Sequence, residues 1–266
     1  MLLSIRDLGL TVPLPHGPRR ILRGVSLDVE AGETVGLVGE SGSGKSTTAR
    51  AVLQLVPEGA HTTGSISVGG VDVSPDDPAG VRAIRTEHAA MIFQDPRSSL
   101  NPVRRIGDSA TERLVHVHGI ARAEATRRLL DLMAEVGLRE PDQLLRKYPH
   151  QLSGGMLQRV SIAAALSTNP RLLLADEATS ALDVTTQAEV LALLRRLRRE
   201  RGLAVLFITH DLLLAGACCD RVYVMREGSI VDEQPGKTVF VDPANPYTRA
   251  LADATPRLPE REHGHA

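Results

Sequence analysis

The sequence predicts an α/β protein that combines a parallel sheet with a small antiparallel sheet. A short apolar run over 34–38 leads directly into a glycine-rich loop, which is typical of a buried parallel strand. Two further apolar runs, 172–175 and 203–208, flank a helical pattern, and this strand–helix–strand order also indicates a parallel sheet. Residues 1–12 and 25–29 instead alternate apolar and polar side chains, as half-buried antiparallel strands do.

The remaining elements follow from local patterns. A run over 65–73 predicts a hairpin that turns at Gly69 and Gly70. Residues 104–147 have a helical pattern, which predicts a separate helical region in the middle of the chain. Other expected elements are helices over 45–55, 123–136, 154–166 and 185–201, and a late hairpin over 221–231. The last fifteen or so residues are rich in proline, charge and histidine and predict a loose tail.

Length and composition limit the classes of protein to consider. The 266 residues suffice for one large domain, and 42% hydrophobic with 24% charged residues excludes wholesale disorder. The formal net charge of -1 gives no support to electrostatic nucleic-acid binding as the main role. Two adjacent cysteines, Cys218 and Cys219, cannot form a disulfide framework and fit a reducing cytosol. No apolar run approaches the ~18 residues that a membrane span needs, so action at a membrane would require partners.

The strongest motif is the segment GESGSGKS, which fits the P-loop pattern G-x-x-x-x-G-K-[ST]. Its glycines allow backbone N–H groups to turn toward phosphate oxygens, and the following helix adds its positive end. Lys45 is expected to reach the β- and γ-phosphates, and the Ser46 hydroxyl to ligate Mg²⁺. A chance glycine-rich turn is the alternative, and the strand before and the helix after disfavour it. The predicted ATP-binding residues are Gly39, Glu40, Ser41, Gly42, Ser43, Gly44, Lys45, Ser46 and Thr47.

A second anchor for the metal is expected at the end of the strand that begins at 172. Asp176 ends this apolar run and is predicted to hold Mg²⁺. Glu177 follows directly and therefore faces the same site, where a carboxylate can accept a proton from the water that attacks the γ-phosphate. An Asp-Glu pair in a strand-to-loop turn can also serve only as helix caps.

Two further polar residues are candidates for contact with the phosphates, the metal or the attacking water. His210 follows the strand over 203–208, and a neutral histidine there can donate a hydrogen bond to a γ-phosphate oxygen. The alternative is a structural histidine at a strand end. Gln94 directly precedes the helical region, where its amide can contact Mg²⁺ or the attacking water.

The segment LSGGMLQR marks a second helix that begins with small residues. Ser153, Gly154 and Gly155 open this helix, and such an N-terminus binds anions. One ATP cannot need both this motif and the P-loop of the same subunit if the helical region separates them. We therefore expect these three residues to cap the γ-phosphate held by a second subunit. An ordinary serine N-cap is the alternative.

In their order and spacing, these motifs and the segment 180–183 resemble the ATPase subunits of ABC transporters over nearly the full chain. The resemblance implies a P-loop NTPase (RecA-like) core with an antiparallel β subdomain and an α-helical subdomain, and a head-to-tail dimer that encloses two ATP. It implies one ATPase domain over 1–252, a helical subdomain at about 95–168 and a loose tail over 253–266. The implied site residues are Glu177, His210 and Gln94 in catalysis, Ser46, Gln94 and Asp176 on the metal, and Ser153, Gly154, Gly155 and Asp183 at the partner's ATP.

Three segments, 92–102, 176–184 and 245–251, are similar to the oligopeptide, dipeptide and nickel importers. This resemblance implies an ATP-hydrolysing subunit that energises uptake of a peptide, nickel or a similar small solute. The implied partners are two membrane permease subunits, a second identical or related ATPase and, indirectly, an extracytoplasmic solute-binding protein, with no nucleic acid. The implied location is the cytoplasmic face of the cell membrane. The solute and the choice between homodimer and heterodimer stay open.

The sequence departs from the family pattern at three places. Val12 is the nearest match to the aromatic residue that usually stacks on adenine, and His16 is a poor substitute for it. No cysteine cluster follows the Pro-Tyr-Thr segment, so no iron–sulfur centre is expected. Leu157 replaces the usual arginine, lysine or glutamine, and we expect little effect on ATP because the phosphate-facing residues precede it.

Two rival functions use the same motifs. A soluble ABC ATPase that acts on DNA or ribosomes usually carries a long coiled coil, a zinc module or a second cassette, and this sequence has none of these. An ABC exporter ATPase is disfavoured only by the similarity of the segments 92–102 and 245–251 to importers. The tail histidines His263 and His265 are treated as incidental.

Overall fold

The computed structural model describes residues 1–241 and 243–254. Its central sheet has six strands in the order β10-β9-β3-β8-β7-β6. The strands are β3 (Thr34–Val38), β6 (Ala89–Ile92), β7 (Leu172–Asp176), β8 (Ala204–Ile208), β9 (Arg221–Arg226) and β10 (Ser229–Pro235). All neighbours pair in parallel except β9 and β10, which form the predicted late hairpin. The α/β class and its parallel sheet are therefore confirmed.

The apolar runs fill both faces of this sheet. Alternate residues of β8 belong to different cores, with Phe207 in the core under the helical region and Leu206 in the core toward the second sheet. Leu173 and Leu174 of β7 divide in the same way. Both faces are buried, which explains why these strands lack the alternation of a half-exposed strand.

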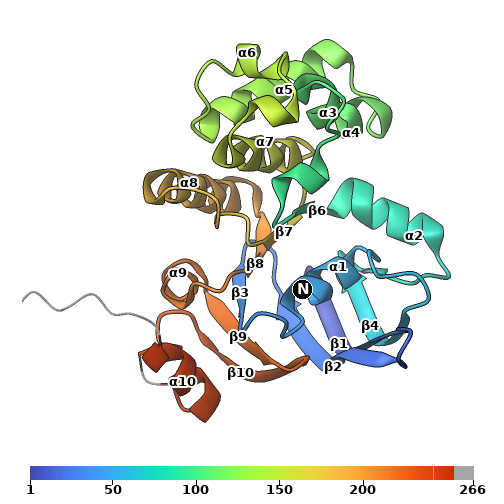
Figure 1. Ribbon diagram of the computed structural model, residues 1–266, viewed down its shortest axis with the longest axis vertical. Coiled ribbons are helices and arrows are strands. Elements are labelled where there is room, and N and C mark those ends of the chain that lie inside the picture. The colour runs from blue at the N-terminus through green and yellow to red at the C-terminus, as the bar shows by residue number, and fades with distance from the viewer. Residues whose placement is uncertain (242, 255–266) are drawn as a thin grey trace, which may run out of the picture.

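A four-stranded antiparallel sheet in the order β2-β1-β4-β5 lies beside the core (Figure 1). Its strands are β1 (Leu3–Val12), β2 (Arg19–Val29), β4 (His61–Val68) and β5 (Val71–Asp72). The predicted hairpin at Gly69 and Gly70 is confirmed by the pairing of Val68 with Val71. The expected strand over 25–29 was too short, because β2 pairs with β1 as far as Val12 and Arg19.

The helices outside the helical region pack on the two sheets. They are α1 (Lys45–Val52), α2 (Pro78–Ala83), the π-helix η1 (Ile84–His88), α8 (Val184–Arg201), α9 (Leu212–Cys218) and α10 (Pro246–Ala254). The helix expected over 45–55 ends earlier, because Gln54 adopts a left-handed φ of 51°. The helix expected over 185–201 is confirmed, and Gly202 ends it with a φ of 66°.

The helical region lies between β6 and β7 in the chain and forms the upper layer of Figure 1. It contains η2 (Pro96–Ser99), α3 (Ile106–Ala110), α4 (Glu112–His116), α5 (Arg122–Glu135), α6 (Pro141–Leu145), η3 (Pro149–Gln151) and α7 (Gly154–Ser167). The helix expected over 123–136 corresponds to α5, whose buried face includes Leu129 and Met133. The expected helical pattern over 104–147 is thus confirmed. The division of the chain at about 95–168 into a separate subdomain stays a prediction.

The C-terminal segment differs from expectation. The predicted loose tail over 253–266 begins inside α10, which continues to Ala254. The rest of that tail, including His263 and His265, lies outside the described residues. Among the described helices, none combines the length and apolarity required to cross a membrane.

Candidate nucleotide-binding site

The P-loop joins β3 to α1 and can be made only with glycine at two positions. Gly39 has a φ of +147°, and a Cβ there would lie 2.1 Å from the carbonyl oxygen of Met225 on β9. Gly44 has a φ of +107°, and its Cβ would lie 2.8 Å from a methyl carbon of Leu22. The positive φ values, which glycine adopts readily, let the loop curve tightly before α1 begins at Lys45.

Lys45 is buried inside the curve of this loop. Its Nζ donates hydrogen bonds of 2.8 Å to the carbonyl oxygens of Gly39 and Glu40. Burial lowers the pKa of Lys45, and the negative charges of Glu177, Asp176 and Glu40 oppose that effect. The ammonium group is therefore held within the loop by two carbonyl oxygens, and an anionic phosphate there would offset the cost of its burial.

Ser46 and Asp176 meet next to the P-loop. The Ser46 hydroxyl donates a hydrogen bond of 2.7 Å to Asp176 Oδ1. Asp176 is fully buried, and its other oxygen, Oδ2, has no hydrogen-bond partner among the described residues. Burial raises the pKa of Asp176, although the Ser46 hydrogen bond lowers it.

This pair fits a magnesium ion. A buried carboxylate oxygen with no protein donor is costly unless a cation or proton satisfies it. Within the described part of the chain no group of three or more His, Cys, Asp or Glu side chains could hold a metal. Such a sparse donor set suits Mg²⁺, which takes few protein oxygens and binds further to water and phosphate oxygens.

The three predicted catalytic residues come together at the carboxyl ends of three adjacent strands. Glu177 directly follows β7, whereas Gln94 and His210 come two residues after β6 and β8. Gln94 Nε2 donates a hydrogen bond of 2.8 Å to Glu177 Oε2. His210 Nδ1 lies 3.3 Å from Glu177 Oε1.

The backbone of Glu177 is itself unusual. Its φ of 47° is left-handed, which is uncommon for a residue with a side chain. Its N–H donates a hydrogen bond of 3.0 Å to the carbonyl of Ile208 at the end of β8. This turn keeps the Glu177 carboxylate close enough to the buried Asp176 for its negative charge to raise the pKa of Asp176.

The second glycine-containing motif lies at the start of α7, in the helical layer and not at the P-loop (Figure 1). Ser153 accepts a hydrogen bond of 3.3 Å from the Met156 N–H and so caps the helix. Gly154 is exposed, and a Cβ built on it would meet no atom within 4 Å. The motif therefore presents an open helix N-terminus.

Asp183 has a local partner that the sequence analysis did not foresee. Its carboxylate accepts hydrogen bonds from the N–H and hydroxyl of Thr186, at 3.0 and 2.8 Å, and caps α8. These bonds lower the pKa of Asp183. A contact between Asp183 and a partner's nucleotide stays a prediction.

Gln158 is a site residue that the sequence analysis missed. It is fully buried on α7, and its Nε2 donates a hydrogen bond of 2.8 Å to the carbonyl of Ala178. Ala178 directly follows Glu177, so this bond ties α7 to the turn that contains Glu177. The only sequence signal is a glutamine on the apolar face of a helix. Leu157, the departure noted above, is also buried and packs into the core.

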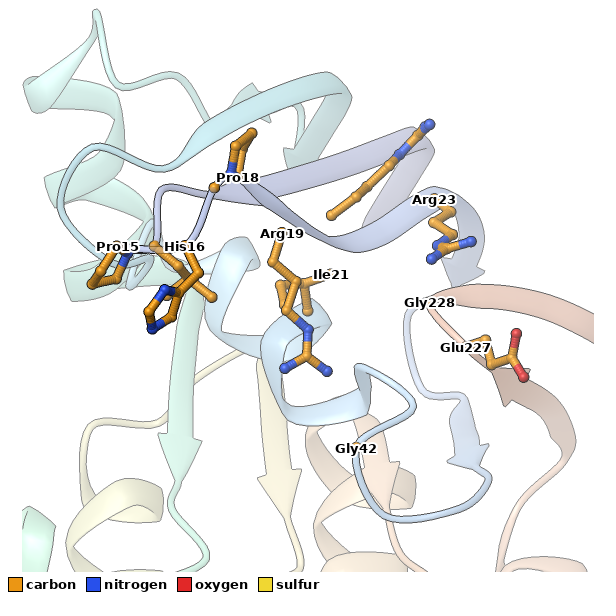
Figure 2. A pocket seen from close by; sticks show the side chains of 12 residues that line it. Pro15, His16, Pro18, Arg19, Ile21, Arg23, Gly42, Glu227 and Gly228 are labelled. Atoms are coloured by element: carbon orange, nitrogen blue, oxygen red, sulfur yellow. The ribbon is translucent and has the colours of Figure 1, made fainter.

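A pocket of about 710 Å³ opens beside the P-loop (Figure 2). Gly42 of the loop forms one wall. Another is formed by Pro15 and His16 in the connection between β1 and β2 and by Arg19 at the start of β2. Figure 2 shows the Arg19 guanidinium extending from β2 toward the loop at Gly42. Val12, where the base contact was expected, does not line this pocket.

Comparison with known proteins identifies the family. A family model described as ABC transporter matches residues 22–180, more than half of the chain. The chain belongs to the ABC transporter family. As a member of this family it is an ATPase, and the expected P-loop NTPase fold is confirmed.

Several ATP-binding proteins of transport systems are similar over almost the whole chain. The peptidoglycan transport ATP-binding protein YejF of Agrobacterium fabrum is 46% identical over 258 residues, covering 96% of this chain and 47% of that protein. The probable D,D-dipeptide transport ATP-binding protein DdpD of Escherichia coli is 44% identical over 264 residues, or 98% and 79% of the two chains. The oligopeptide transport ATP-binding protein OppD of Bacillus subtilis is 41% identical over 259 residues, or 97% and 72%. The chain thus spans about half of the first relative and most of the other two.

Solved ABC structures share the fold. A dimer of the ATP-binding cassette MJ0796, bound to ADP and Pi, superposes with a TM-score of 0.78 at 28% identity, covering 88% of this chain and 98% of that one. The cbiO1 protein of Clostridium perfringens gives a TM-score of 0.72 at 26% identity, with 91% of both chains covered.

Proposed function

We propose that this ABC ATPase powers an importer that takes up a peptide, nickel or a similar small solute through two separate membrane permease subunits. The observation that carries the proposal is the junction of Gln94, Glu177 and His210 beside Lys45, Ser46 and Asp176. The similarity to ATP-binding proteins named for peptidoglycan, dipeptide and oligopeptide transport supports the class of solute. The solute itself would be selected by the permeases and by an extracytoplasmic binding protein.

In this proposal the P-loop residues Gly39 to Thr47 bind the triphosphate. Lys45 exchanges its carbonyl acceptors for phosphate oxygens, and Ser46, Asp176 and Gln94 hold Mg²⁺. The bound Mg²⁺ would neutralise phosphate charge. Glu177 orients the attacking water and accepts its proton, while His210 donates a hydrogen bond to the γ-phosphate. The pocket beside Gly42 receives the nucleoside, because it is an open space next to the loop that would hold the triphosphate.

A second ATPase subunit, identical or related, completes the site. Ser153, Gly154 and Gly155 cap the partner's γ-phosphate, and Asp183 lies at the same interface. The exposed start of α7 supports this role, because its N-terminus faces solvent and not the P-loop of its own chain. The cassette MJ0796, with a similar fold, is a dimer bound to ADP and Pi.

The segment after Gln94 is proposed to transmit ATP binding to the permeases from the cytoplasmic face of the membrane. Ser99 lies on η2, and its hydroxyl forms a hydrogen bond of 2.9 Å with the Ser161 hydroxyl on α7. Val103, in the connection to α3, is 80% exposed. We take residues 95–168 as a helical subdomain that carries this contact within one ATPase domain over 1–252.

The decisive experiment is purification of the tagged chain from detergent-solubilised membranes, followed by identification of bound proteins and reconstitution in liposomes. We expect two permease subunits and ATP-dependent uptake of a peptide or metal solute. The variant Lys45→Ala should assemble with its partners normally, because Lys45 lies inside the P-loop. It should nevertheless show no ATP hydrolysis and no solute uptake. Co-purification of ribosomal or DNA-binding proteins would contradict the importer proposal. ATP-dependent efflux of solute from the liposomes would also contradict it.

A further inference from the structure

The pocket beside the P-loop takes one wall from a single face of β2. Side chains two residues apart on a strand point to the same side, and Arg19, Ile21 and Arg23 all line this pocket (Figure 2). Leu22 points to the opposite side of the strand and is fully buried in the core. The buried leucine therefore fixes the direction in which the pocket-lining side chains of β2 point.

Backbone contacts hold β2 against the phosphate loop. The Arg23 N–H donates a hydrogen bond of 2.8 Å to the carbonyl of Gly228, in the turn between β9 and β10. The Gly228 N–H in turn donates one of 2.9 Å to the carbonyl of Ser43 in the P-loop. At the start of the strand, Arg19 pairs with Val12 of β1. The backbone that carries Arg19 is therefore fixed relative to the loop.

Arg19 brings an unpaired guanidinium to this pocket. It is exposed, and its side chain has no hydrogen bond or ion pair with any residue that the structure describes. Other charged groups of the lining do have partners. Arg20 Nε donates a hydrogen bond of 3.3 Å to a backbone carbonyl, and Glu227 Oε1 lies 3.7 Å from Arg226 Nε. In Figure 2 the Arg19 guanidinium extends toward the loop at Gly42, so it lies between the open pocket and the phosphate site.

The rest of the lining suits a flat, uncharged group better than another phosphate. Much of it is apolar and consists of Leu14, Pro15, Pro18 and Ile21. The phosphates already have the backbone N–H groups of the P-loop and the ammonium of Lys45. A guanidinium is planar, and it stacks on the faces of aromatic rings and of nucleic-acid bases. Val12, which pairs with Arg19 across the hairpin, does not line the pocket and leaves this place to the longer side chain.

We propose that Arg19 binds the base of the nucleotide by laying its guanidinium plane on the face of the ring. The contact needs a plane and a cation but no particular hydrogen bond on the base, so it accepts any base that offers a ring face. The proposal rests on binding of a nucleoside triphosphate at the P-loop and this pocket, which the proposed function includes. It adds the residue that holds the base, which the contacts to the phosphates do not supply.

The test separates the plane of the Arg19 side chain from its charge. ATP binding is measured at high salt, where distant charges are screened. We expect about fivefold weaker binding in Arg19→Ala, the loss typical of one cation–π contact, and a similar loss in Arg19→Lys, which keeps the charge without the plane. Arg19→Tyr should stay within about twofold of the native affinity, because its ring restores a stacking face.

A matched arginine elsewhere controls for the loss of an exposed positive charge. Arg82, on α2, is also exposed and does not line the pocket. Arg82→Ala should therefore bind ATP normally. The melting temperatures of the Arg19 and Arg82 variants should equal that of the native chain, because neither side chain is buried.

Inorganic tripolyphosphate, which has no base, shows which part of the nucleotide Arg19 contacts. Its binding should be the same in the native chain and in Arg19→Ala. The proposal is overturned by native ATP affinity in Arg19→Ala or Arg19→Lys, by equal losses of ATP and tripolyphosphate binding, or by an Arg19→Tyr variant as weak as Arg19→Ala. Lys45→Ala is measured in parallel and should weaken the binding of both ligands. If Lys45→Ala binds both normally, the P-loop assignment fails, and not the role of Arg19 alone.

Discussion

Gln94 and Glu177 share a hydrogen bond of 2.8 Å that joins the segments after two parallel strands, β6 and β7. His210 lies 3.3 Å from the second oxygen of the same carboxylate, so both oxygens have a polar neighbour. A ligand that moves the Gln94 Nε2 group away from Glu177 leaves Oε2 without this donor. The start of the helical region and the proposed base are therefore coupled through one side-chain contact.

Replacing the proposed base should separate binding from hydrolysis. Glu177→Gln keeps the shape of the side chain and removes the proton acceptor, so we expect hydrolysis to slow ~10²-fold or more while ATP still binds. The persisting ATP should hold two subunits together, giving an ATP-dependent dimer by light scattering and monomers with ADP. If the partner is a related ATPase, the dimer should form only after that subunit is added. Wild-type turnover in this variant would exclude Glu177 as the base.

The dimer should depend on the exposed start of α7. Adding Ser153→Arg to Glu177→Gln places bulk and a new cation where the partner's γ-phosphate is expected to dock. The double variant should therefore remain monomeric in saturating ATP, with unchanged ATP binding by each subunit. Gln143→Ala, an exposed change on α6 in the helical region, serves as the control and should dimerise normally. Dimerisation of the Ser153→Arg double variant would place the interface elsewhere.

The buried carboxylate of Asp176 should reduce the stability of the protein in the absence of magnesium. Its folded pKa is raised above the ordinary 3.8, so the folded protein binds the proton more tightly than the unfolded chain. The stability loss is complete above the folded pKa and disappears as the pH falls below 3.8. Asp176→Asn should therefore raise the free energy of unfolding at pH 8, on the order of 1 kcal/mol, and less at lower pH.

Urea unfolding at several pH values checks this expectation. Asp76→Asn, at an exposed loop position, is the control and should show no gain. The Asp176→Asn variant should also lose ATP hydrolysis, because it loses a negative metal ligand. A variant that is less stable than the native chain at pH 8 would show that the carboxylate is satisfied within the protein.

The binding site should discriminate poorly between the adenine base of ATP and the guanine base of GTP. None of the residues that line the pocket beside Gly42 is Phe, Tyr or Trp, and an aromatic contact contributes on the order of 1 kcal/mol beyond burial. ATP and GTP should therefore compete for the site within about threefold of each other. Competition titration against a fluorescent ATP analogue measures the ratio. A strong preference for ATP would mean that another group recognises adenine.

Changes on the segment after Gln94 should affect transport more than hydrolysis. Ser99→Ala removes the hydrogen bond of 2.9 Å to Ser161 that fastens η2 to α7. We expect reduced solute uptake in reconstituted liposomes and near-native basal ATPase activity of the isolated subunit. An equal loss of both activities would make this segment part of the catalytic site.

The sequence predicted those parts of the fold whose pattern is local. The buried strand β7 and the P-loop helix follow from apolar runs and glycines, and their meeting at Ser46 and Asp176 follows from the rule that parallel strands end together. The four-residue strand β6 was missed, because two of its residues are alanines and its partner lies far along the chain. The contact between Gln158 and Ala178 was missed for a related reason, since only tertiary packing places a helix glutamine on that carbonyl.

In the proposed dimer, the bond from Gln158 to Ala178 would connect the sites of two different ATP molecules within each subunit. The first turn of α7 is proposed to serve the nucleotide of the neighbouring subunit, whereas the turn after β7 serves the chain's own nucleotide. One buried amide, just past that first turn, fastens the two together. Separation of the subunits at one ATP site would thus move the turn that carries Glu177, the proposed general base, at the other ATP site. In a dimer with two unlike ATPases, this contact would let a site that hydrolyses slowly control the timing of its faster neighbour.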